Sequence, residues 1–218
     1  MSYLIHRTVK APALDAGFDS ADWKNSRALS VDVFRPEGSG HRPETRFRMQ
    51  YDDEGLFGLF SVRDRYVRCV AEQFQDPVCR DSCVEFFVQP SQGAGHLNFE
   101  FNASGVLLAQ VHRDTLHPRT VSGWLSEAEA SGIRIFHSLP GRVEPEIADE
   151  IRWELGFFLP FSIFAATHGA PVPVSGTVWR ANVYKCGDNT SHPHWASWRP
   201  VKRLNFHEPD CFGDMEFE

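Results

Sequence analysis

The most regular pattern along the chain is an alternation of apolar and polar residues over short segments. In residues 45–51, Phe47 and Met49 alternate with arginines, which is typical of a strand with one buried face. Residues 56–62 are apolar on both faces, as expected of a central strand. Further strands are predicted at Cys83–Val88, His96–Asn102, Val106–Val111, Ile133–His137, Ile151–Leu159, Thr177–Cys186 and Asp214–Phe217.

Helical signals are few. Phe161–His168 lies between Pro160 and Gly169, residues that often begin and end a helix, and Ser122–Ala130 has room for one or two turns. Many short strands with one or two short helices predict an all-β fold, a sandwich of two antiparallel sheets of the jelly-roll or immunoglobulin-like type. Because no linker divides the chain and both ends carry apolar residues, we expect a single domain spanning residues 1–218.

Composition and charge exclude several classes of protein. The 218 residues include 22 basic and 29 acidic side chains, which leaves a net charge of −7, and 42% are apolar. This balance argues against disorder, and the acidic excess argues against nucleic acid or a membrane surface as a partner. The sequence holds neither a stretch of about 20 apolar residues that would span a bilayer nor a signal peptide. We therefore expect a cytoplasmic protein, or a secreted or periplasmic one if the chain has been trimmed.

The hairpin predicted over residues 82–102 places polar side chains on one face. If its strands pair symmetrically about residues 90–95, Glu85 lies opposite Glu100, on the face that also carries Asn98. The Cβ atoms of two directly opposed glutamates lie about 5 Å apart, and their carboxylates repel each other. A cation, a shared proton or sugar hydroxyls should therefore compensate the two charges. Because retaining glycosidases use carboxyl pairs about 5 to 5.5 Å apart, catalysis by this pair is an alternative. A polar face that simply meets solvent is another.

A second concentration of chemistry lies between Trp179 and Trp198. Aromatic rings stand there beside Arg, Lys, Asn, Asp and His residues, a combination that recognises sugars by stacking and by hydrogen bonds to hydroxyls. Strand alternation places Trp179 in the core and puts Arg180 and Asn182 on the opposite face. The loop that follows is predicted to present Lys185, Asp188, His192, His194, Trp195 and Trp198.

Histidines and cysteines raise the alternative of a zinc site. Two candidate sets are His192, His194, Cys186 and His207, and Cys79 with Cys83. Neither set has the spacing of the common structural zinc motifs, and the cysteines serve equally well as small buried residues. The odd number of cysteines, five, also argues against a disulfide framework.

Six segments together resemble carbohydrate-binding module family 9, in its short stand-alone form. They are LDAGFDSADW (14–23), FRMQYDDEGLFGLFSVRD (47–64), DSCVEFF (81–87), HLNFEFNASG (96–105), NVYKCGD (182–188) and FHEPDCFGDMEF (206–217). In this order they cover nearly the whole chain. The resemblance implies a β-sandwich that binds carbohydrate without catalysis, calcium in some members, and frequent attachment to glycoside hydrolases.

The resemblance also implies site residues. Sugar-binding members hold a sugar between two tryptophans, whose positions fall near Val78 and on Phe206 in this sequence. The glutamate of the family's DS-VE segment matches Glu85, whereas the family's hydroxyl-binding arginine is replaced by Glu100. Half of the aromatic clamp is therefore missing, and one charge is reversed.

The two clusters and the resemblance together predict a carbohydrate site that requires no cofactor. Its predicted members are Glu85, Asn98, Glu100, Arg180, Asn182, Lys185, Asp188, His194, Trp195, Trp198, Phe206 and His207. One alternative is a sugar-acting hydrolase that uses Glu85 and Glu100 as its acid–base pair. Another is a module that keeps the fold but binds a metal ion or a protein.

Overall fold

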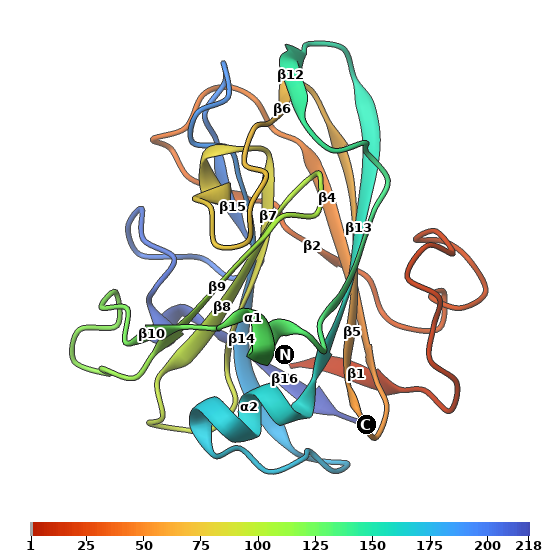
Figure 1. Cartoon of the computed structure of the whole chain (residues 1–218), viewed down its shortest axis with the longest axis vertical. Coiled ribbons are helices and arrows are strands. Elements are labelled where there is room, and N and C mark those ends of the chain that lie inside the picture. Colours follow the sequence, from red (N-terminus) through yellow and green to blue (C-terminus); the bar gives the residue numbers. More distant parts are fainter. Residues whose placement is uncertain (1) are drawn as a thin grey trace.

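Strands stacked in two layers are the main regular structure of the protein (Figure 1). The structure is a computed structural model that describes residues 2–218. Sheet A contains, in spatial order, β10 (Gly123–Trp124), β9 (Leu107–His112), β8 (His96–Asn102), β7 (Cys83–Gln89), β14 (Val178–Cys186) and β16 (Gly213–Phe217). Sheet B contains β4 (Glu44–Tyr51), β5 (Gly55–Asp64), β13 (Ile151–Pro160) and β11 (Arg134–His137).

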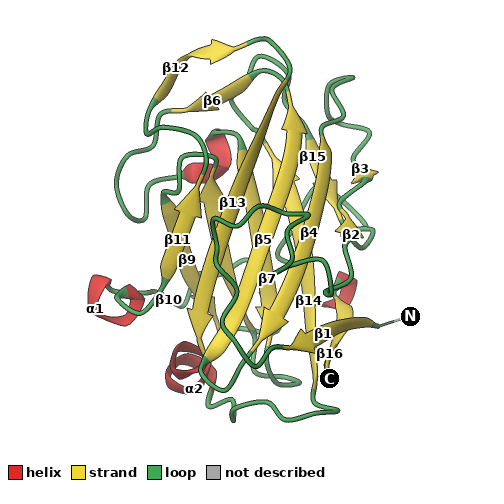
Figure 2. Ribbon diagram, turned by 90° about the vertical axis from the view of Figure 1, so that its right-hand side faces the viewer, coloured by secondary structure: helices red, strands yellow, loops and turns green. Residues whose placement is uncertain are grey.

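One strand joins the two sheets. β1 (Tyr3–Arg7) pairs in parallel with β16 through its first residues and with β4 through its last. Short strands β2 (Leu29–Ser30), β3 (Val33–Phe34) and β15 (Trp195–Ser197) extend the sheets, whereas β6 (Val67–Cys69) and β12 (Val143–Ile147) form a separate ribbon at one end (Figure 2). The helices are α1 (Glu127–Ala130) and α2 (Phe161–His168), with single 3₁₀ turns at Val78–Arg80 and Pro209–Cys211.

The predicted all-β sandwich is confirmed, and each predicted strand agrees with an observed one to within two residues. The predicted helix agrees in both bounds. Its end is set by Gly169, which adopts a left-handed conformation with φ of 62° and whose N–H is donated to the last carbonyls of the helix. Seven strands within residues 2–218 were not predicted, because they are short and follow no clear alternation: β1, β2, β3, β6, β10, β12 and β15.

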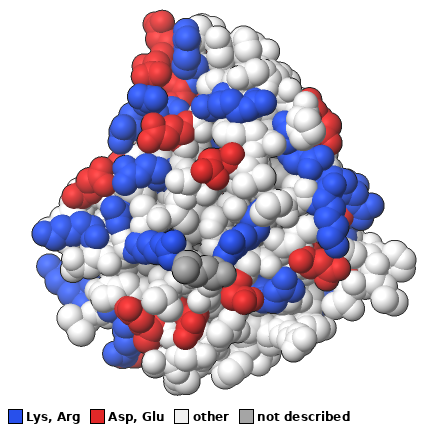
Figure 3. Space-filling view, turned by 180° about the vertical axis from the view of Figure 1, so that it is seen from behind, with Lys and Arg blue, Asp and Glu red and all other residues white. Residues whose placement is uncertain are grey.

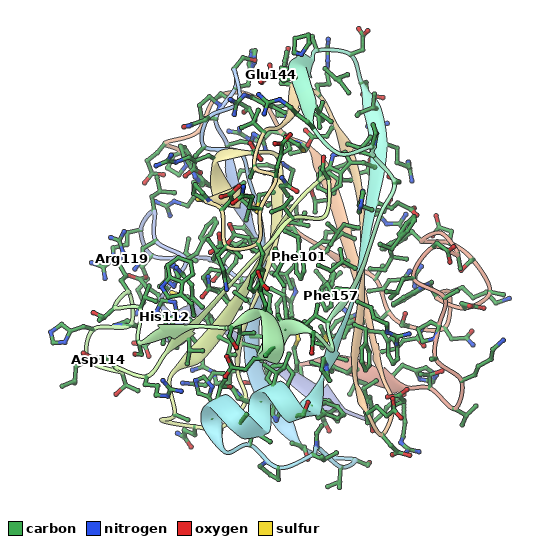
Figure 4. The ribbon with its side chains drawn as sticks, viewed as in Figure 1. Phe101, His112, Asp114, Arg119, Glu144 and Phe157 are labelled. Carbon is green, nitrogen blue, oxygen red and sulfur yellow. The ribbon has the colours of Figure 1, made fainter. Side chains whose placement is uncertain are left out.

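The core lies between the sheets and is built from alternate residues of the facing strands. Phe86, Phe99 and Phe101 point inward from sheet A and are fully buried. Phe101 stacks on Phe157 of sheet B with ring centroids 5.2 Å apart and planes within 6° (Figure 4). Buried aromatic pairs of this kind contribute about 0.5–1.5 kcal/mol beyond the burial of their area.

The other face of sheet A is also covered, by loops rather than by a sheet. Residues near the 3₁₀ turn Val78–Arg80 and residues 198–212 pack against outward-facing side chains such as Phe87 and Tyr184. On the molecular surface, acidic and basic side chains are intermixed on the face shown in Figure 3. Polar residues that alternation places on the outer face of β7, β8 and β14 are therefore buried instead of solvated.

A buried ion pair lies between the sheets, where Asp64 ends β5. Lys185 Nζ lies 3.3 Å from Asp64 Oδ2, and both side chains are fully buried. His41 lies 2.7 Å from the other carboxylate oxygen, and Trp153 Nε1 donates a hydrogen bond of 3.3 Å to Asp64. Burial alone opposes ionisation, but Lys185 and His41 outweigh it and hold the pKa of Asp64 well below its usual range.

Replacing Asp64 by Asn should destabilise the protein strongly, because it would leave the buried Lys185 side chain without its paired carboxylate. We expect a loss of about 3–5 kcal/mol in the free energy of unfolding, measured by urea denaturation at neutral pH. Asp53→Asn is the matched control, since Asp53 pairs with Arg7 at an exposed position and should cost less than about 1 kcal/mol. Equal losses in the two variants would contradict this account of the buried pair.

Candidate functional site

The register of the β7–β8 hairpin places two carboxylates side by side on the outer face of sheet A. Glu85 lies directly opposite Glu100, as the symmetric pairing predicted, and Tyr184 of β14 flanks Glu85 on the other side. Only 2% of Glu85 and 6% of Glu100 is exposed. A solvated polar face is therefore the wrong interpretation for this hairpin.

A cavity of about 290 Å³ opens above the two carboxylates. We call it the carboxylate pocket, and its lining consists of Cys79, Glu85, Phe87, Glu100, Arg119, Cys186, Asp188, Trp195, Leu204, Asn205, Phe206 and His207. Strands β7, β8 and β14 supply the residues nearest the sheet. β15 supplies Trp195, the 3₁₀ turn Val78–Arg80 supplies Cys79, and loops supply the others, including Arg119 from the segment between β9 and β10, which is labelled in Figure 4.

Aromatic side chains in the pocket are held in place by specific contacts. Phe206 stacks on Tyr184 with centroids 4.0 Å apart and planes within 11°, and the Tyr184 hydroxyl donates to the Phe206 carbonyl. Trp195 Nε1 donates a hydrogen bond of 2.7 Å to Asp188 Oδ1. Because these contacts fix their orientation, both rings are preorganised surfaces for an apolar ligand face.

The two glutamates differ in their hydrogen bonds. Glu85 Oε1 accepts from the Cys186 thiol at 3.0 Å, but its buried Oε2 atom has no hydrogen-bond partner in the protein. Glu100 Oε1 accepts from Asn98 Nδ2 at 2.7 Å. Since buried polar atoms are almost always paired, the Oε2 atom of Glu85 identifies the place where a ligand donor would be received.

Burial controls the charge of the pocket. It raises the pKa of Glu85, with repulsion from Glu100 as the second cause, and it raises the pKa of Glu100 to about 7 despite the hydrogen bond from Asn98. Burial likewise raises the pKa of Asp188, although its bond from Trp195 acts in the opposite direction. A raised pKa favours the protonated form of each carboxyl group, and a protonated carboxyl group offers both an O–H donor and an acceptor oxygen.

The structure brings together six of the twelve predicted site residues and places one directly behind them. Those that line the pocket are Glu85, Glu100, Asp188, Trp195, Phe206 and His207. Asn98 supports Glu100 through its hydrogen bond. The separation of these residues in the sequence, from 85 to 207, is bridged by the pairing of β7 with both β8 and β14.

The prediction that Lys185 and His194 reach this site from a loop is wrong. Strand β14 continues to Cys186, so alternation turns Lys185 inward, where its Nζ lies 2.8 Å from His194 Nε2. Trp198 also lies elsewhere, packed edge-on against Tyr3 with centroids 6.2 Å apart. Its preceding residues form β15, which pairs with β14 and carries the chain away from the pocket.

Arg180 and Asn182 have the predicted strand orientation but do not line the pocket. The Arg180 guanidinium donates to the Phe212 carbonyl at 2.7 Å and lines a separate cavity. The Asn182 side chain is buried, donates to the Arg199 carbonyl at 3.0 Å and accepts from the Arg199 backbone N–H at 2.9 Å. It therefore holds the segment that follows β15 against β14.

Several pocket residues were not predicted from the sequence. Phe87 shares the face of Glu85, so strand alternation already carried the signal for it. Arg119 lies in a loop whose path cannot be predicted from a local sequence pattern. It places an arginine in the pocket, although Glu100 occupies the strand position at which the family resemblance implies one. At the other clamp position Val78 is buried and contributes no aromatic ring, while its neighbour Cys79 lines the pocket.

Three groups within residues 2–218 bring potential metal ligands within 4.8 Å of one another. They are His96, His112 and His207; His41, Asp64 and His194; and Cys83, Glu85 and Cys186. The predicted zinc set is dispersed, since its residues His194, Cys186 and His207 fall in three different groups. Most ligand atoms in each group are nitrogen or sulfur, and no group contains more than one carboxylate. Calcium binds six to eight oxygen ligands, so none of the three groups suits it.

The fold and the pocket define a β-sandwich with a ligand site on one sheet, and comparison with known families identifies its class. The model of carbohydrate-binding family 9 matches residues 19–217. The chain therefore belongs to carbohydrate-binding family 9, as its sequence motifs predicted. A search of the curated proteins finds no match. Within residues 2–218, no helix is long and apolar enough to cross a membrane.

Solved structures share this fold. A proposed carbohydrate-binding protein from Bacteroides uniformis is 29% identical, with a TM-score of 0.86 over 100% of this chain and 99% of the other. A family 9 module from Caldicellulosiruptor kristjanssonii in complex with glucose is 13% identical, with a TM-score of 0.65 over 99% of this chain and 95% of that one. The same comparison with a cellotriose complex gives 14% identity and a TM-score of 0.64, over 99% and 93% of the chains.

Replacing Glu100 by Gln should change the pH dependence of stability. The folded pKa of about 7 exceeds the ordinary 4.5, so the stability that protonation contributes is complete below pH 4.5 and is lost as pH rises through 7. Glutamine stays neutral at every pH, and it also removes the charge repulsion between position 100 and Glu85. The variant should therefore exceed the wild type by on the order of 2 kcal/mol at about pH 8 and match it at about pH 4.

Urea denaturation at both pH values measures this difference. Glu127→Gln, at an exposed position of α1, is the control and should show no such change between the two pH values. A difference between Glu100→Gln and wild type that is the same at both pH values would contradict the raised pKa of Glu100.

Proposed function

We propose that the carboxylate pocket binds a carbohydrate without altering it. The observation that carries this proposal is the buried, unpartnered Oε2 atom of Glu85, which lines a cavity that Trp195 and Phe206 also line. Sugars present apolar C–H faces that stack on aromatic rings, together with hydroxyls that both donate and accept hydrogen bonds. Membership in carbohydrate-binding family 9 supports the same ligand class.

The pocket offers complementary groups for several hydroxyls. Glu85 Oε2 accepts one ligand hydroxyl, and the raised pKa of Glu100 favours its protonated form, which can donate as well as accept a hydrogen bond. Arg119 and Asn205 provide N–H donors to ring or hydroxyl oxygens from the loop side. A sugar bound in this way supplies the hydrogen bonds that burial has withdrawn from the carboxyl groups.

The size of the pocket favours a short ligand. Its volume of about 290 Å³ lies at the lower limit of typical ligand pockets, which are about 300–1,000 Å³. We infer that a single sugar unit, or the end of a chain, enters the pocket, and that further units extend outside it. The glucose and cellotriose bound by the Caldicellulosiruptor kristjanssonii module are suitable first probes.

The placement of the glutamates favours binding over hydrolysis. Glycosidases place two carboxyl groups on opposite sides of the bond that breaks. Glu85 and Glu100 are instead neighbours on one face of sheet A, so a sugar above them meets both from the same side. The raised pKa of Glu100 would suit a general acid, but its partner Glu85 lies beside it on the same sheet face and not across the cavity.

Binding should depend on the aromatic rings and on Glu85. We expect Trp195→Ala, Phe206→Ala and Glu85→Gln each to weaken the affinity for a retained sugar at least about 10-fold, because each removes a buried contact with the ligand. Isothermal titration with glucose and cellotriose, together with affinity gels containing polysaccharides, measures this. Trp124→Ala is the matched control, since Trp124 is exposed on β10 and lies outside the pocket lining.

Two results would overturn the proposal. The first is a wild-type protein that retains no mono-, oligo- or polysaccharide, and the second is a loss of affinity in Trp124→Ala as large as in the pocket variants. If the wild type instead releases shortened sugars from an oligosaccharide and Glu85→Gln releases none, the hydrolase alternative is established.

A further inference from the structure

A second, larger cavity opens on the same face of sheet A as the carboxylate pocket. We call it the Gln89 cavity, and its volume is about 710 Å³. Gln89 of β7 and Arg180 of β14, which are paired in the sheet, form its floor together with His96 of β8. The turn between β7 and β8, the loop between β9 and β10 and the segment after β15 form the rest. The same three strands and two of the same loops therefore build both cavities.

The two cavities are neighbours along these shared segments. β7 contributes Phe87 to the carboxylate pocket and Gln89 to the larger cavity. The loop between β9 and β10, which is labelled in Figure 4 at Arg119, contributes that residue to the pocket and Pro118 to the cavity. Glu85 and Gln89 lie four residues apart on one face of β7, which corresponds to about 13 Å. A chain of a few sugar units spans this distance.

Two imidazole rings mark the boundary between the cavities. His96 lines the Gln89 cavity, and His207, which is half-buried, lines the carboxylate pocket. Nε2 of His96 and Nδ1 of His207 are 3.2 Å apart. The cavities are therefore separated at this point by one pair of contacting rings.

The side chain of Gln89 has hydrogen-bonding groups that the protein leaves unused. Gln89 is only 8% exposed, and within residues 2–218 its amide makes no hydrogen bond with another protein group. The buried amides of Asn98, Asn102 and Asn182, on the same face of sheet A, are each hydrogen-bonded to protein groups. Since buried polar groups are almost always paired, the amide of Gln89 identifies a second place where a ligand would be received.

We propose that the Gln89 cavity binds the sugar units that follow the one in the carboxylate pocket, so that one oligosaccharide occupies both. This inference rests on the proposed function, and it assigns a place to the units that the smaller pocket cannot hold. The amide of Gln89 both donates and accepts, which suits a hydroxyl group of such a unit.

The charges around the cavity favour a neutral ligand of this kind. Three basic and three acidic side chains balance each other in its lining: Arg180, Lys202 and Arg203, and Asp114, Glu208 and Asp210. The cavity therefore attracts neither anions nor cations strongly. Leu116, Pro118 and Pro209 supply apolar surface for the C–H faces of a sugar.

Arg180 is held in position to contribute a further donor. Its Nη2 atom donates to the Phe212 carbonyl at 2.7 Å, which fixes the orientation of the guanidinium group. Its Nη1 atom makes no hydrogen bond within the part of the chain that the structure describes. Arg180 therefore has the sugar-binding role that its sequence context predicted, but in the Gln89 cavity.

Calorimetric titration of the full chain with glucose and with cellohexaose tests the proposal. We expect the wild type to bind cellohexaose at least about 10-fold more tightly than glucose, because only the longer sugar reaches the Gln89 cavity. Gln89→Ala should weaken the affinity for cellohexaose about 5-fold and leave the affinity for glucose unchanged, because it removes a hydrogen bond made only to the later units. Gln73→Ala is the matched control, since Gln73 is exposed and lines neither cavity.

A second variant removes a contact without touching a buried residue. Lys202 is exposed at the cavity, and within residues 2–218 it forms no ion pair. Lys202→Ala should therefore fold as the wild type does, weaken the affinity for cellohexaose about 2-fold and leave that for glucose unchanged.

The outcomes separate this inference from the proposed function. If the wild type binds glucose and cellohexaose equally well, or if neither variant weakens cellohexaose binding, the inference is overturned and the proposed function stands. An equal loss of affinity for both sugars in Gln89→Ala would also overturn it, because Gln89 would then act on the first unit. If neither sugar binds, the inference fails, and the affinity gels with other polysaccharides decide the proposed function.

Discussion

The pairing register of β7 with β8 and β14 is the constraint on which the site depends. Phe86 and Phe99 face the core across from sheet B, so Glu85 and Glu100 must point to the opposite side. A slip of one residue would bury both carboxylates among the aromatic rings between the sheets and expose the phenylalanines. The same alternation that builds the core therefore also brings the two acids together.

Loops convert this polar face into a pocket. In most antiparallel sheets such a face meets water, but here residues near Val78 and residues 198–212 cover it. Covering raises the pKa of both glutamates and leaves one carboxyl oxygen without a partner. The buried carboxylate of Asp64 is stabilised differently, because the ammonium of Lys185 pairs with it as a counterion. Within residues 2–218, Glu85 forms no ion pair, and this difference favours the proposed ligand, which is neutral and rich in hydroxyls.

The sequence predicts the fold closely because alternation along β4, β7, β8 and β14 is a local signal. It also predicts the Glu85–Glu100 pair, which requires only a symmetric hairpin. It places Lys185 wrongly, because this residue was assigned to the following loop although the alternation of the predicted strand Thr177–Cys186 turns it toward the core. Residues such as Arg119 and Asn205 reach the pocket through the path of loops, which depends on the tertiary structure.

The most direct test of this account is the structure of the protein bound to a sugar that it retains. We expect the sugar in the carboxylate pocket, with a C–H face on Phe206 or Trp195 and a hydroxyl within hydrogen-bond distance of Glu85 Oε2. A sugar bound instead in the cavity beside Arg180, or against Trp198 and Tyr3, with the carboxylate pocket unchanged, would contradict it.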